Sequence, residues 1–376
     1  MTTVFVVNSG SSSIKWELLD AESGSAYSGG IVERIGEPGG GAADHDDGMR
    51  QILTALGDEH PAVVGHRVVH GGAEFTAATI ITDEVERRLG EISVLAPLHN
   101  PENLKGIRAA RAAFADVPHV AVFDTAFHGT LPHEAYTYAI DADVAREHGI
   151  RRYGFHGTSY RFVAGRAAEL LGRELSELKL IVFHLGNGAS VCAIDGGRSV
   201  DTSMGMTPLE GLVMGTRSGD IDPGALFHLG RAGMTLPELD LLLNRQSGLL
   251  GMTGTGDMRD VQFAADAGDE KAQAALAVYY HRLRHYLGAY LVGLGGVDAI
   301  VFTAGVGENN AATRCETVKG LEGFGIELDA EANTSPERDA RDISTANSET
   351  RVLVIPTNEE LQIARESVTA TTTVGL

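Results

Sequence analysis

Two short apolar runs separated by a glycine-containing turn occur near the start of the chain, and the same arrangement returns about half a chain later. VFVVN at 4–8 and IKWELLD at 14–20 flank the turn SGSSS, and Ile14, Trp16 and Leu18 are apolar positions of the second run. This pattern predicts a strand, a tight turn and a second strand. LIVFH, LGNGA and SVCAID at 180–195 repeat the plan, which indicates a duplicated domain. Two unrelated hairpins are the alternative, because β-hairpins are common.

Strand and helix patterns then alternate along both halves of the chain. The predicted strands are AVVGHRVVH at 62–70, HVAVFDTAF at 119–127 and DAIVFTAG at 298–305, and the predicted helices cover 103–114 and 270–294. Such alternation predicts mixed α/β layers with ligands at the carboxyl ends of strands. The polar stretches 36–49 and 329–350 are expected to be surface loops, and the tail 368–373 is expected to be frayed.

One long segment fits neither period. MGMTPLEGLVMGTRSGDIDP at 204–223 has a glycine every few residues and surrounds a single arginine, Arg217, with apolar side chains and with Asp220 and Asp222. The planar guanidinium group suits carboxylate or phosphate, so the segment predicts an anion-binding loop. An arginine that only ties down a long loop is the alternative.

Length and charge narrow the class of protein. A chain of 376 residues favours two domains, and 30 basic against 51 acidic residues give a net charge of −21. This balance argues against nucleic acid or an anionic membrane as the main partner. Cys192 and Cys315 have no metal-ligand spacing. The chain opens on strand-like TVFVVN without a leader pattern, and its apolar run at 286–297 is too short for a membrane span, so a cytoplasmic protein is expected.

Three glycine-rich turns carry groups that suit phosphate. NSGSSS at 8–13, followed by Lys15, offers backbone N–H groups, hydroxyls and an ammonium group, although a plain hairpin turn is the alternative. HLGNG at 184–188 and GVGEN at 305–309 add two more glycine-lined loops, and together the three predict a nucleotide enclosed between two halves. No HExxH or HxH pattern indicates zinc. His156 in YGFHGTS stands out among the histidines, since it lies between an aromatic residue and a glycine turn.

These segments occur in the order in which they occur in acetate kinases, and the chain resembles that family over nearly its whole length. The motifs are VNSGSSSIKWELLD, GHRVVHGG, LAPLHNP, VFDTAFH, YGFHGTS, HLGNGAS, SVDTSMGMTPLEGLVMGTRSGDIDP, FTAGVGENN and IPTNEELQIARE. The resemblance implies an α/β fold of two duplicated ribonuclease-H-like domains, as in the acetate and sugar kinase/actin superfamily, with the active site in the interdomain cleft. The implied domains are 1–126 plus 361–376 and the nucleotide-binding 127–360.

The resemblance also implies a set of site residues, each carried over on its own motif. The catalytic residues would be Asp124, His156, Arg217 and Arg67, and the metal ligands Asn8 and Glu359. The substrate pocket would be lined by Arg67, Val69, Leu98, Phe155 and Pro208. The nucleotide would be bound by Ser11, Ser13, Lys15, His184, Leu185, Gly186, Asn187, Gly188, Asp257, Met258, Arg259, Gly305, Val306, Gly307, Glu308 and Asn309.

The activity that the resemblance implies is reversible transfer of the ATP γ-phosphoryl group to acetate, giving acetyl phosphate and ADP. Mg²⁺, or Mn²⁺ in its place, would be the cofactor, and a homodimer the assembly. Direct in-line transfer is the simplest route, with a phosphorylated Asp124 or Glu359 as the alternative. Because acetate is already ionised, Asp124 is expected to orient magnesium through water or to fix an arginine. The rival functions are a propionate or butyrate kinase and, in another class, an actin-like nucleotide-dependent switch protein.

The chain departs from the family pattern in two places. Tyr160 follows HGTS where the family usually has a histidine, so a hydrogen bond made by that ring must be replaced or lost. The segment between Asp20 and Ala62 is shorter than the family's, which puts the outer strands of the first domain in question.

Overall fold

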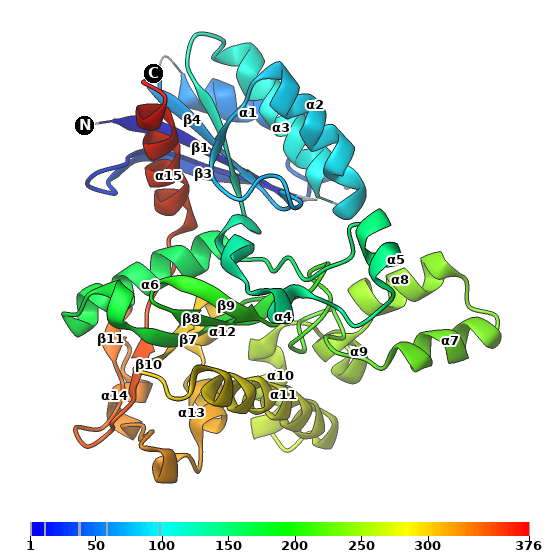
Figure 1. Ribbon diagram of the computed structural model, residues 1–376, viewed down its shortest axis with the longest axis vertical. Coiled ribbons are helices and arrows are strands. Elements are labelled where there is room, and N and C mark those ends of the chain that lie inside the picture. The colour runs from blue at the N-terminus through cyan, green and yellow to red at the C-terminus, as the bar shows by residue number, and fades with distance from the viewer. Residues whose placement is uncertain (1, 11–12, 37–38, 58, 98, 376) are drawn as a thin grey trace. The chain divides into compact units, whose positions relative to one another are not determined.

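The computed structural model describes residues 2–10, 13–36, 39–57, 59–97 and 99–375, which form two compact units (Figure 1). The first unit comprises Met1–Gly129, Phe155–Phe162 and Asn358–Leu376, and the second comprises Thr130–Gly154 and Val163–Thr357. Each contains one six-stranded sheet. Of the helices in the described part of the chain, none has the length and apolar character needed to cross a membrane.

The sheet of the first unit has the strand order β3-β2-β1-β4-β6-β5. Its strands are β1 (Thr3–Ser9), β2 (Ser13–Asp20), β3 (Ala26–Glu33), β4 (Val63–Val68), β5 (Thr79–Ile80) and β6 (His119–Phe123). β1 pairs antiparallel with β2, which confirms the predicted hairpin, and the order β1-β4-β6 is parallel. Because parallel strands end at one edge, Asn8, Arg67 and Asp124 come to the same edge of the sheet.

Helices cover both faces of this sheet. α1 (His45–Leu56) and α3 (Asn100–Ala113) pack on the face that presents Val64, and they share a core with Phe5 and Ile14. α15 (Glu359–Thr373) packs on the opposite face, where a Cβ added to Gly65 would lie 2.6 Å from Ser367 Oγ. Glycine at this position therefore lets the helix approach the strand. The unit also contains α2 (Asp83–Glu91), η1 (Ile92–Leu95) and η2 (Ala126–Thr130).

The sheet of the second unit repeats this plan, with the order β11-β12-β10-β7-β8-β9. Its strands are β7 (Lys179–Leu185), β8 (Ala189–Asp195), β9 (Arg198–Thr202), β10 (Ala299–Thr303), β11 (Arg341–Asp342) and β12 (Arg351–Val354). β7 and β8 form an antiparallel hairpin. On its other side β7 pairs in parallel with β10, which in turn pairs in parallel with β12. An antiparallel hairpin beside parallel strands occurs in both sheets, so the duplicated α/β fold expected from the sequence is confirmed.

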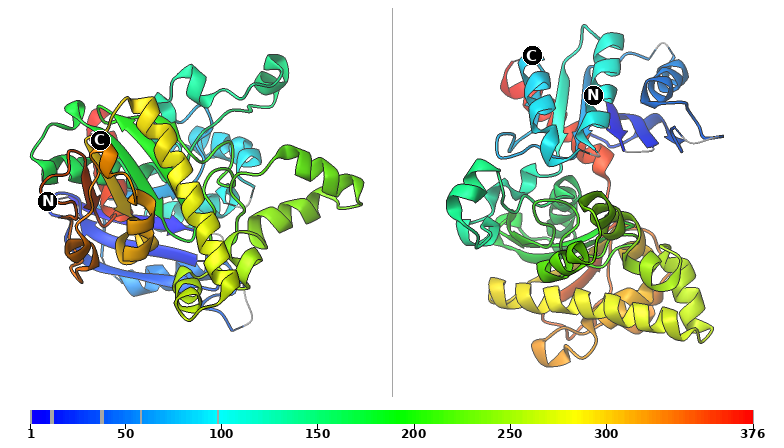
Figure 2. Two further views of the ribbon diagram at one scale, coloured as in Figure 1. Left: turned by 90° about the horizontal axis from the view of Figure 1, so that it is seen from below. Right: turned by 90° about the vertical axis from the view of Figure 1, so that its right-hand side faces the viewer.

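The second unit is rich in helices. They are α4 (His133–Tyr136), α5 (Ala142–Glu147), α6 (Gly157–Leu171), η3 (Leu175–Glu177), α7 (Pro223–Arg231), α8 (Leu236–Arg245), α9 (Gly248–Thr253), α10 (Met258–Asp266), α11 (Glu270–Leu294), α12 (Ala304–Asn309), α13 (Ala311–Val318), η4 (Glu322–Phe324) and α14 (Ala330–Thr334); α6 begins in the first unit. The long α11, yellow in Figure 2, packs on β7 and β8. It covers the residues predicted, because the Asp269 side chain caps its first turn and Gly295 ends it with φ of 67°.

Two stretches expected to be loops contain regular structure. α1 begins inside 36–49, where the Asp44 carboxylate accepts a hydrogen bond from Asp47 N and the helix buries Met49 and Ile52. The stretch 329–350 contains α14 and β11. In both places the polar composition hid an aspartate that caps a helix, Asp44 for α1 and Asp329 for α14. The shortened segment after Asp20 still supplies an outer strand, β3.

The tail and one glycine-rich turn were also predicted wrongly. Residues 368–373 form the last turns of α15, where Thr371 is buried and its hydroxyl donates to the Ser367 carbonyl. Packing against the sheet holds these threonines in a helix despite their weak helix propensity. Residues 305–309 belong to the short helix α12 instead of a loop.

Candidate functional site

Arg67 is the centre of a charged cluster at the edge of the first sheet. Its Nε and Nη2 donate to the two carboxylate oxygens of Asp124 at 2.9 and 2.6 Å, and its Nη1 donates to Asn8 Oδ1 at 3.0 Å. Asp124 is buried, and Arg67 is half-buried. A guanidinium group has five N–H donors, so these three bonds leave two donors for a ligand. The bidentate pair fixes the plane in which those donors lie.

Glu359 brings further negative charge to the cluster. It is the first residue of α15, whose N-cap Asn358 accepts a hydrogen bond from Leu361 N. Burial, opposed by Arg67 and reinforced by the Asp124 and Glu360 carboxylates, raises the pKa of Glu359 to about 7. A carboxyl group with so high a pKa indicates that the carboxylates around it outnumber the nearby positive charges.

This imbalance fits a magnesium site built from few protein ligands. Magnesium is usually held by one or two carboxylates, substrate phosphates and water, not by a protein cage. Among the described residues there is no group of three or more His, Cys, Asp or Glu side chains able to hold a metal. The half-buried Glu359 carboxylate and the Asn8 amide oxygen have the ligand chemistry that Mg²⁺ prefers.

The predicted phosphate turn is only partly tested. Ser11 lies outside the described residues. Ser13 closes the turn through its carbonyl, which accepts from Gly10 N at 2.7 Å. Lys15 Nζ lies 2.8 Å from a Glu360 carboxylate oxygen and 3.6 Å from one of Glu17, and the side chain is 44% exposed. The ammonium group is therefore held near the start of α15 and still reaches solvent.

His156 occupies a constrained position just before α6. Its φ is 59°, in the left-handed region that favours glycine. The preceding Phe155 is buried, its carbonyl is bonded to His128 Nε2 at 2.9 Å, and its ring meets that of His70 edge-on at 5.5 Å. A histidine held in a strained conformation by packed neighbours is typical of functional sites.

The other predicted wall residues divide between the units. Val69 is buried in the first unit, where its N–H donates to Asn103 Oδ1 at 3.1 Å. Pro208 lies in the second unit, and Leu98 lies outside the described residues. Tyr160, the departure from the family pattern, is fully buried and packs against the rings of Phe127 and His128.

Arg217 in the second unit differs from Arg67, because within the described part of the chain no carboxylate pairs with it. It is half-buried, and its Nη1 donates to the Pro208 carbonyl at 2.7 Å. Burial, together with the nearby Arg245, lowers the pKa of Arg217. Among the ion pairs of the described residues, none involves Arg217. A partly buried cation without a counter-ion favours an anionic ligand.

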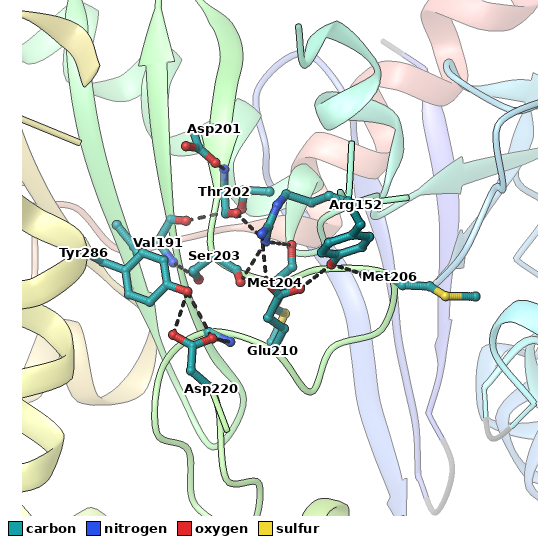
Figure 3. A network of polar contacts seen from close by, with 12 residues as sticks. Arg152, Val191, Asp201, Thr202, Ser203, Met204, Met206, Glu210, Asp220 and Tyr286 are labelled. Atoms are coloured by element: carbon teal, nitrogen blue, oxygen red, sulfur yellow. Dashed lines mark hydrogen bonds and ion pairs between the residues drawn. The ribbon is translucent and has the colours of Figure 1, made fainter. Parts of the chain in front are cut away.

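The start of the 204–223 loop is anchored by Arg152 and Glu210 (Figure 3). One Arg152 amino group donates to the carbonyls of 202–204 at 3.0 to 3.1 Å, and the other binds Glu210 Oε1 at 2.8 Å. Tyr138 donates to the second Glu210 oxygen. A Cβ at Gly205 would overlap both the Glu210 carboxylate and the Tyr138 hydroxyl, so a larger residue there would displace these two groups from the network. No motif or spacing in the sequence indicates this network.

The end of the same loop is anchored to α11. Asp220 accepts from the Tyr286 hydroxyl at 2.9 Å (Figure 3). It also accepts from Gly211 N and from Arg282 at 3.1 Å. Asp222 caps α7 by accepting from Gly224 N. The two aspartates that follow Arg217 therefore hold the end of the loop, and the arginine is left as the group able to meet an anion.

A cavity of about 580 Å³ in the second unit is lined by many of the residues predicted to bind the nucleotide. The predicted residues that line it are Gly186, Asn187, Asp257, Met258, Arg259, Gly305, Val306 and Asn309. The lining residues that the sequence reasoning missed are Gly215, Leu249, Gly256, Tyr279 and Asn310. Gly215 and Asn310 lie inside quoted motifs, whereas Tyr279 lies inside α11, where nothing in the helical pattern distinguishes it.

The remaining predicted nucleotide residues do not line this cavity. His184 and Leu185 end β7, and Gly188 accepts from Gly186 N at 3.0 Å to shape the turn. Gly307 faces the sheet, and the Glu308 carboxylate accepts from Thr357 N at 3.2 Å. Their proposed contact with nucleotide stays a prediction.

The fold and these groups define a class of phosphotransferase: two ribonuclease-H-like units, an arginine oriented beside carboxylates, and a glycine-lined cavity. The Acetokinase family model matches residues 3–365. An acetate kinase of Leifsonia xyli is 59% identical over 98% of this chain and 99% of its own length. The chain therefore belongs to the acetokinase family.

Solved structures agree over the whole chain. An acetate kinase from Porphyromonas gingivalis superposes with a TM-score of 0.92 at 41% identity, covering 98% of this chain and 100% of that one. A propionate kinase from Francisella tularensis has the same TM-score at 38% identity, with the same coverage.

Proposed function

We propose that this chain is an acetate kinase, which transfers the γ-phosphoryl group of ATP to acetate and catalyses the reverse reaction. The observation that carries the proposal is Arg67, whose guanidinium group is fixed by Asp124 and retains two unused donors beside a carboxylate-rich, cation-poor edge. An acyl kinase needs such a group, because both the carboxylate acceptor and the transferring phosphoryl group are anionic. The full-length similarity to acetate kinases supports the same substrate.

The residues favour direct in-line transfer. The loose transition state spreads negative charge over the equatorial phosphoryl oxygens, so catalysis consists mainly of alignment and charge stabilisation. Arg67, Arg217 and His156 would supply donors to those oxygens. Asp124 commits both oxygens to Arg67, which suits a positioning role better than that of a nucleophile. Acetate needs no general base because it is already ionised.

Asn8 and Glu359 would hold Mg²⁺, with Mn²⁺ as an alternative, and the ion would neutralise charge on the ATP phosphates. The cavity lined by Gly186, Asp257 and Gly305 would take the adenosine part of ATP or ADP. We expect the enzyme to be a homodimer that acts in the cytoplasm, with neither nucleic acid nor membrane as partner.

A hydroxamate trap tests the proposed reaction. The enzyme is incubated with ATP, Mg²⁺ and hydroxylamine, which converts an acyl phosphate to a hydroxamic acid and releases phosphate. Ferric ion added afterwards forms a coloured complex with the hydroxamic acid. Acetate should give the highest kcat/KM, propionate a lower but measurable value, and butyrate almost none. A preference for butyrate, or no product with any of the three acids, would reject an acetate kinase.

Propionate is the second candidate substrate, because the propionate kinase shares 38% identity over the whole chain. If Val69 lines the methyl pocket, Val69→Ala should raise kcat/KM for propionate relative to acetate by roughly tenfold, within the 1 to 3 kcal/mol that one methylene is worth. Both acids are compared at saturating MgATP. Val68→Ala is the matched control, since Val68 belongs to the hydrophobic core with Phe75 and should affect stability alone. An unchanged ratio in Val69→Ala would remove Val69 from the pocket.

The metal proposal predicts a shift in magnesium dependence. Glu359→Gln should raise the Mg²⁺ concentration at half-maximal rate and leave binding of metal-free nucleotide unchanged. Glu360→Gln is the control, because that carboxylate already pairs with Lys15. In the wild type, the half-saturating Mg²⁺ concentration should fall as pH rises through about 7, since Glu359 must ionise to bind the ion. Equal magnesium dependence in wild type and Glu359→Gln would contradict the assignment.

A further inference from the structure

Arg314 is a fully buried arginine behind the nucleotide cavity. It lies on α13 and is 2% exposed. Its Nε donates to Asn333 Oδ1 at 2.8 Å, and its Nη2 donates to the Asn333 carbonyl at 2.6 Å. Its Nη1 donates to the carbonyls of Gly307 and Glu308, both at 2.9 Å. All three nitrogens of the guanidinium group are thus engaged.

None of these acceptors is a carboxylate. In the described part of the chain Arg314 takes part in no ion pair, and Glu308, whose carbonyl accepts from Arg314, has its carboxylate bonded to Thr357 N instead. Burial and the nearby Arg341 lower the pKa of Arg314 to about 10, so the group stays charged at neutral pH. A buried arginine without an ion pair is less favourable for stability than an apolar residue of similar size. Its hydrogen bonds therefore call for an explanation other than stability.

The hydrogen bonds of Arg314 stabilise α12, a helix that is too short to be stable by itself. α12 has six residues, AGVGEN, of which two are glycine, and a helix this short is marginal even with good helix formers. Its last carbonyls have no partner within the helix, and Arg314 supplies donors to two of them. Asn333 Nδ2 also donates to the Ala311 carbonyl at 3.0 Å, so the Arg314–Asn333 pair braces the start of α13 as well.

The braced segment is the one that lines the cavity. Gly305, Val306 and Asn309 of α12 and the adjoining Asn310 form one wall, whereas Gly307 and Glu308, which accept from Arg314, face away from it. Arg314 itself does not line the cavity. It can affect a ligand there only through α12.

We propose that Arg314 is a positioning residue for the nucleotide, which holds α12 in the conformation that binds ATP and ADP. The inference rests on the proposed function in taking the cavity as the nucleotide site. Loss of the brace should weaken nucleotide binding and leave acetate binding and the transfer step nearly unchanged.

The test compares Arg314→Met with Arg284→Met. Arg284 makes the same kind of contact, since its Nη1 donates to the carbonyls of Glu316, Thr317 and Lys319, but at the other end of α13 and away from the cavity. The dissociation constant of MgADP is measured by calorimetry, and KM for ATP, KM for acetate and kcat by the hydroxamate assay. Arg314→Met should raise the dissociation constant and KM for ATP about tenfold, as expected for two lost hydrogen bonds of about 0.7 kcal/mol each.

Arg284→Met should leave all these constants within about twofold of wild type, which is the expectation for a contact that only supports the fold. Arg314→Lys keeps the positive charge but loses the planar arrangement of N–H donors, so its affinity for MgADP should lie between those of Arg314→Met and the wild type. If Arg314→Met does not fold, Asn333→Ala, which keeps the arginine, should give a smaller rise in the same two constants.

Two results would overturn the proposal. One is an unchanged MgADP dissociation constant in folded Arg314→Met or Asn333→Ala. The other is an equal rise of KM for acetate and for ATP, since this would indicate general loosening of the enzyme. A wild-type chain that binds MgADP but forms no hydroxamate would reject the proposed reaction, and calorimetry would still decide the role of Arg314.

Discussion

Arg67→Ala should lower kcat by a factor of about 10² to 10³ or more, because it removes a donor to charge that develops in the transition state. The same change should also lower the free energy of unfolding, by about 3 to 5 kcal/mol, since it leaves the buried Asp124 carboxylate without its partner. The measurements are steady-state kinetics with acetate and MgATP and thermal unfolding of the same preparations.

A double variant separates the two effects. Arg67→Ala with Asp124→Asn removes the unpaired buried charge, so it should regain much of the lost thermal stability without regaining turnover. Arg111→Ala is a matched control, because that arginine pairs with Asp83 and Glu86 at the surface of the same unit. Turnover restored in the double variant would show that Arg67 serves only to neutralise Asp124, and full turnover in Arg67→Ala would remove it from the site.

The sequence predicts elements best where local signals and tertiary packing agree. In the β1-β2 hairpin the apolar run of β1 is buried throughout Val4–Val7, and Ile14, Trp16 and Leu18 of β2 alternate because one face packs in the core shared with α1 and α3. α11 has a cap residue at one end and glycine at the other. The carboxyl-end positions of Asn8, Arg67 and Asp124 also follow from strand prediction, since parallel neighbours end at one edge.

Prediction fails where distant residues determine local structure. The segment 305–309 has the composition of a turn, and it is helical because Arg314 donates to the carbonyls of Gly307 and Glu308, while Asn333 accepts from Arg314 and holds it in place. The threonine-rich end of α15 is helical because it packs on the first sheet. Arg152 could not be recognised as an anchor of the 204–223 loop, since its acceptors lie about fifty residues further along the chain. In each case the contacting residues are brought close only by the fold, so the local sequence pattern does not indicate them.

Arg217→Ala should abolish most turnover, by a factor of about 10² to 10³, with no loss of thermal stability. Two features separate this arginine from Arg67. Arg217 has one hydrogen bond to a carbonyl and a lowered pKa, which means that its charged form is disfavoured where it lies. Removing it therefore leaves no buried carboxylate unpaired and relieves an unfavourable charge, while the loop stays anchored through Glu210 and Asp220.

The melting temperature of Arg217→Ala should accordingly equal or exceed that of the wild type. Because an anionic ligand would provide the missing counter-ion, saturating acetyl phosphate should raise the wild-type melting temperature and have a much smaller effect on the variant. Asp220→Asn is the opposite control: it loosens the loop and should lower the melting temperature while Arg217 is still present. If Arg217→Ala unfolds several degrees below the wild type, the arginine ties down the loop instead of binding an anion, and its catalytic assignment is wrong.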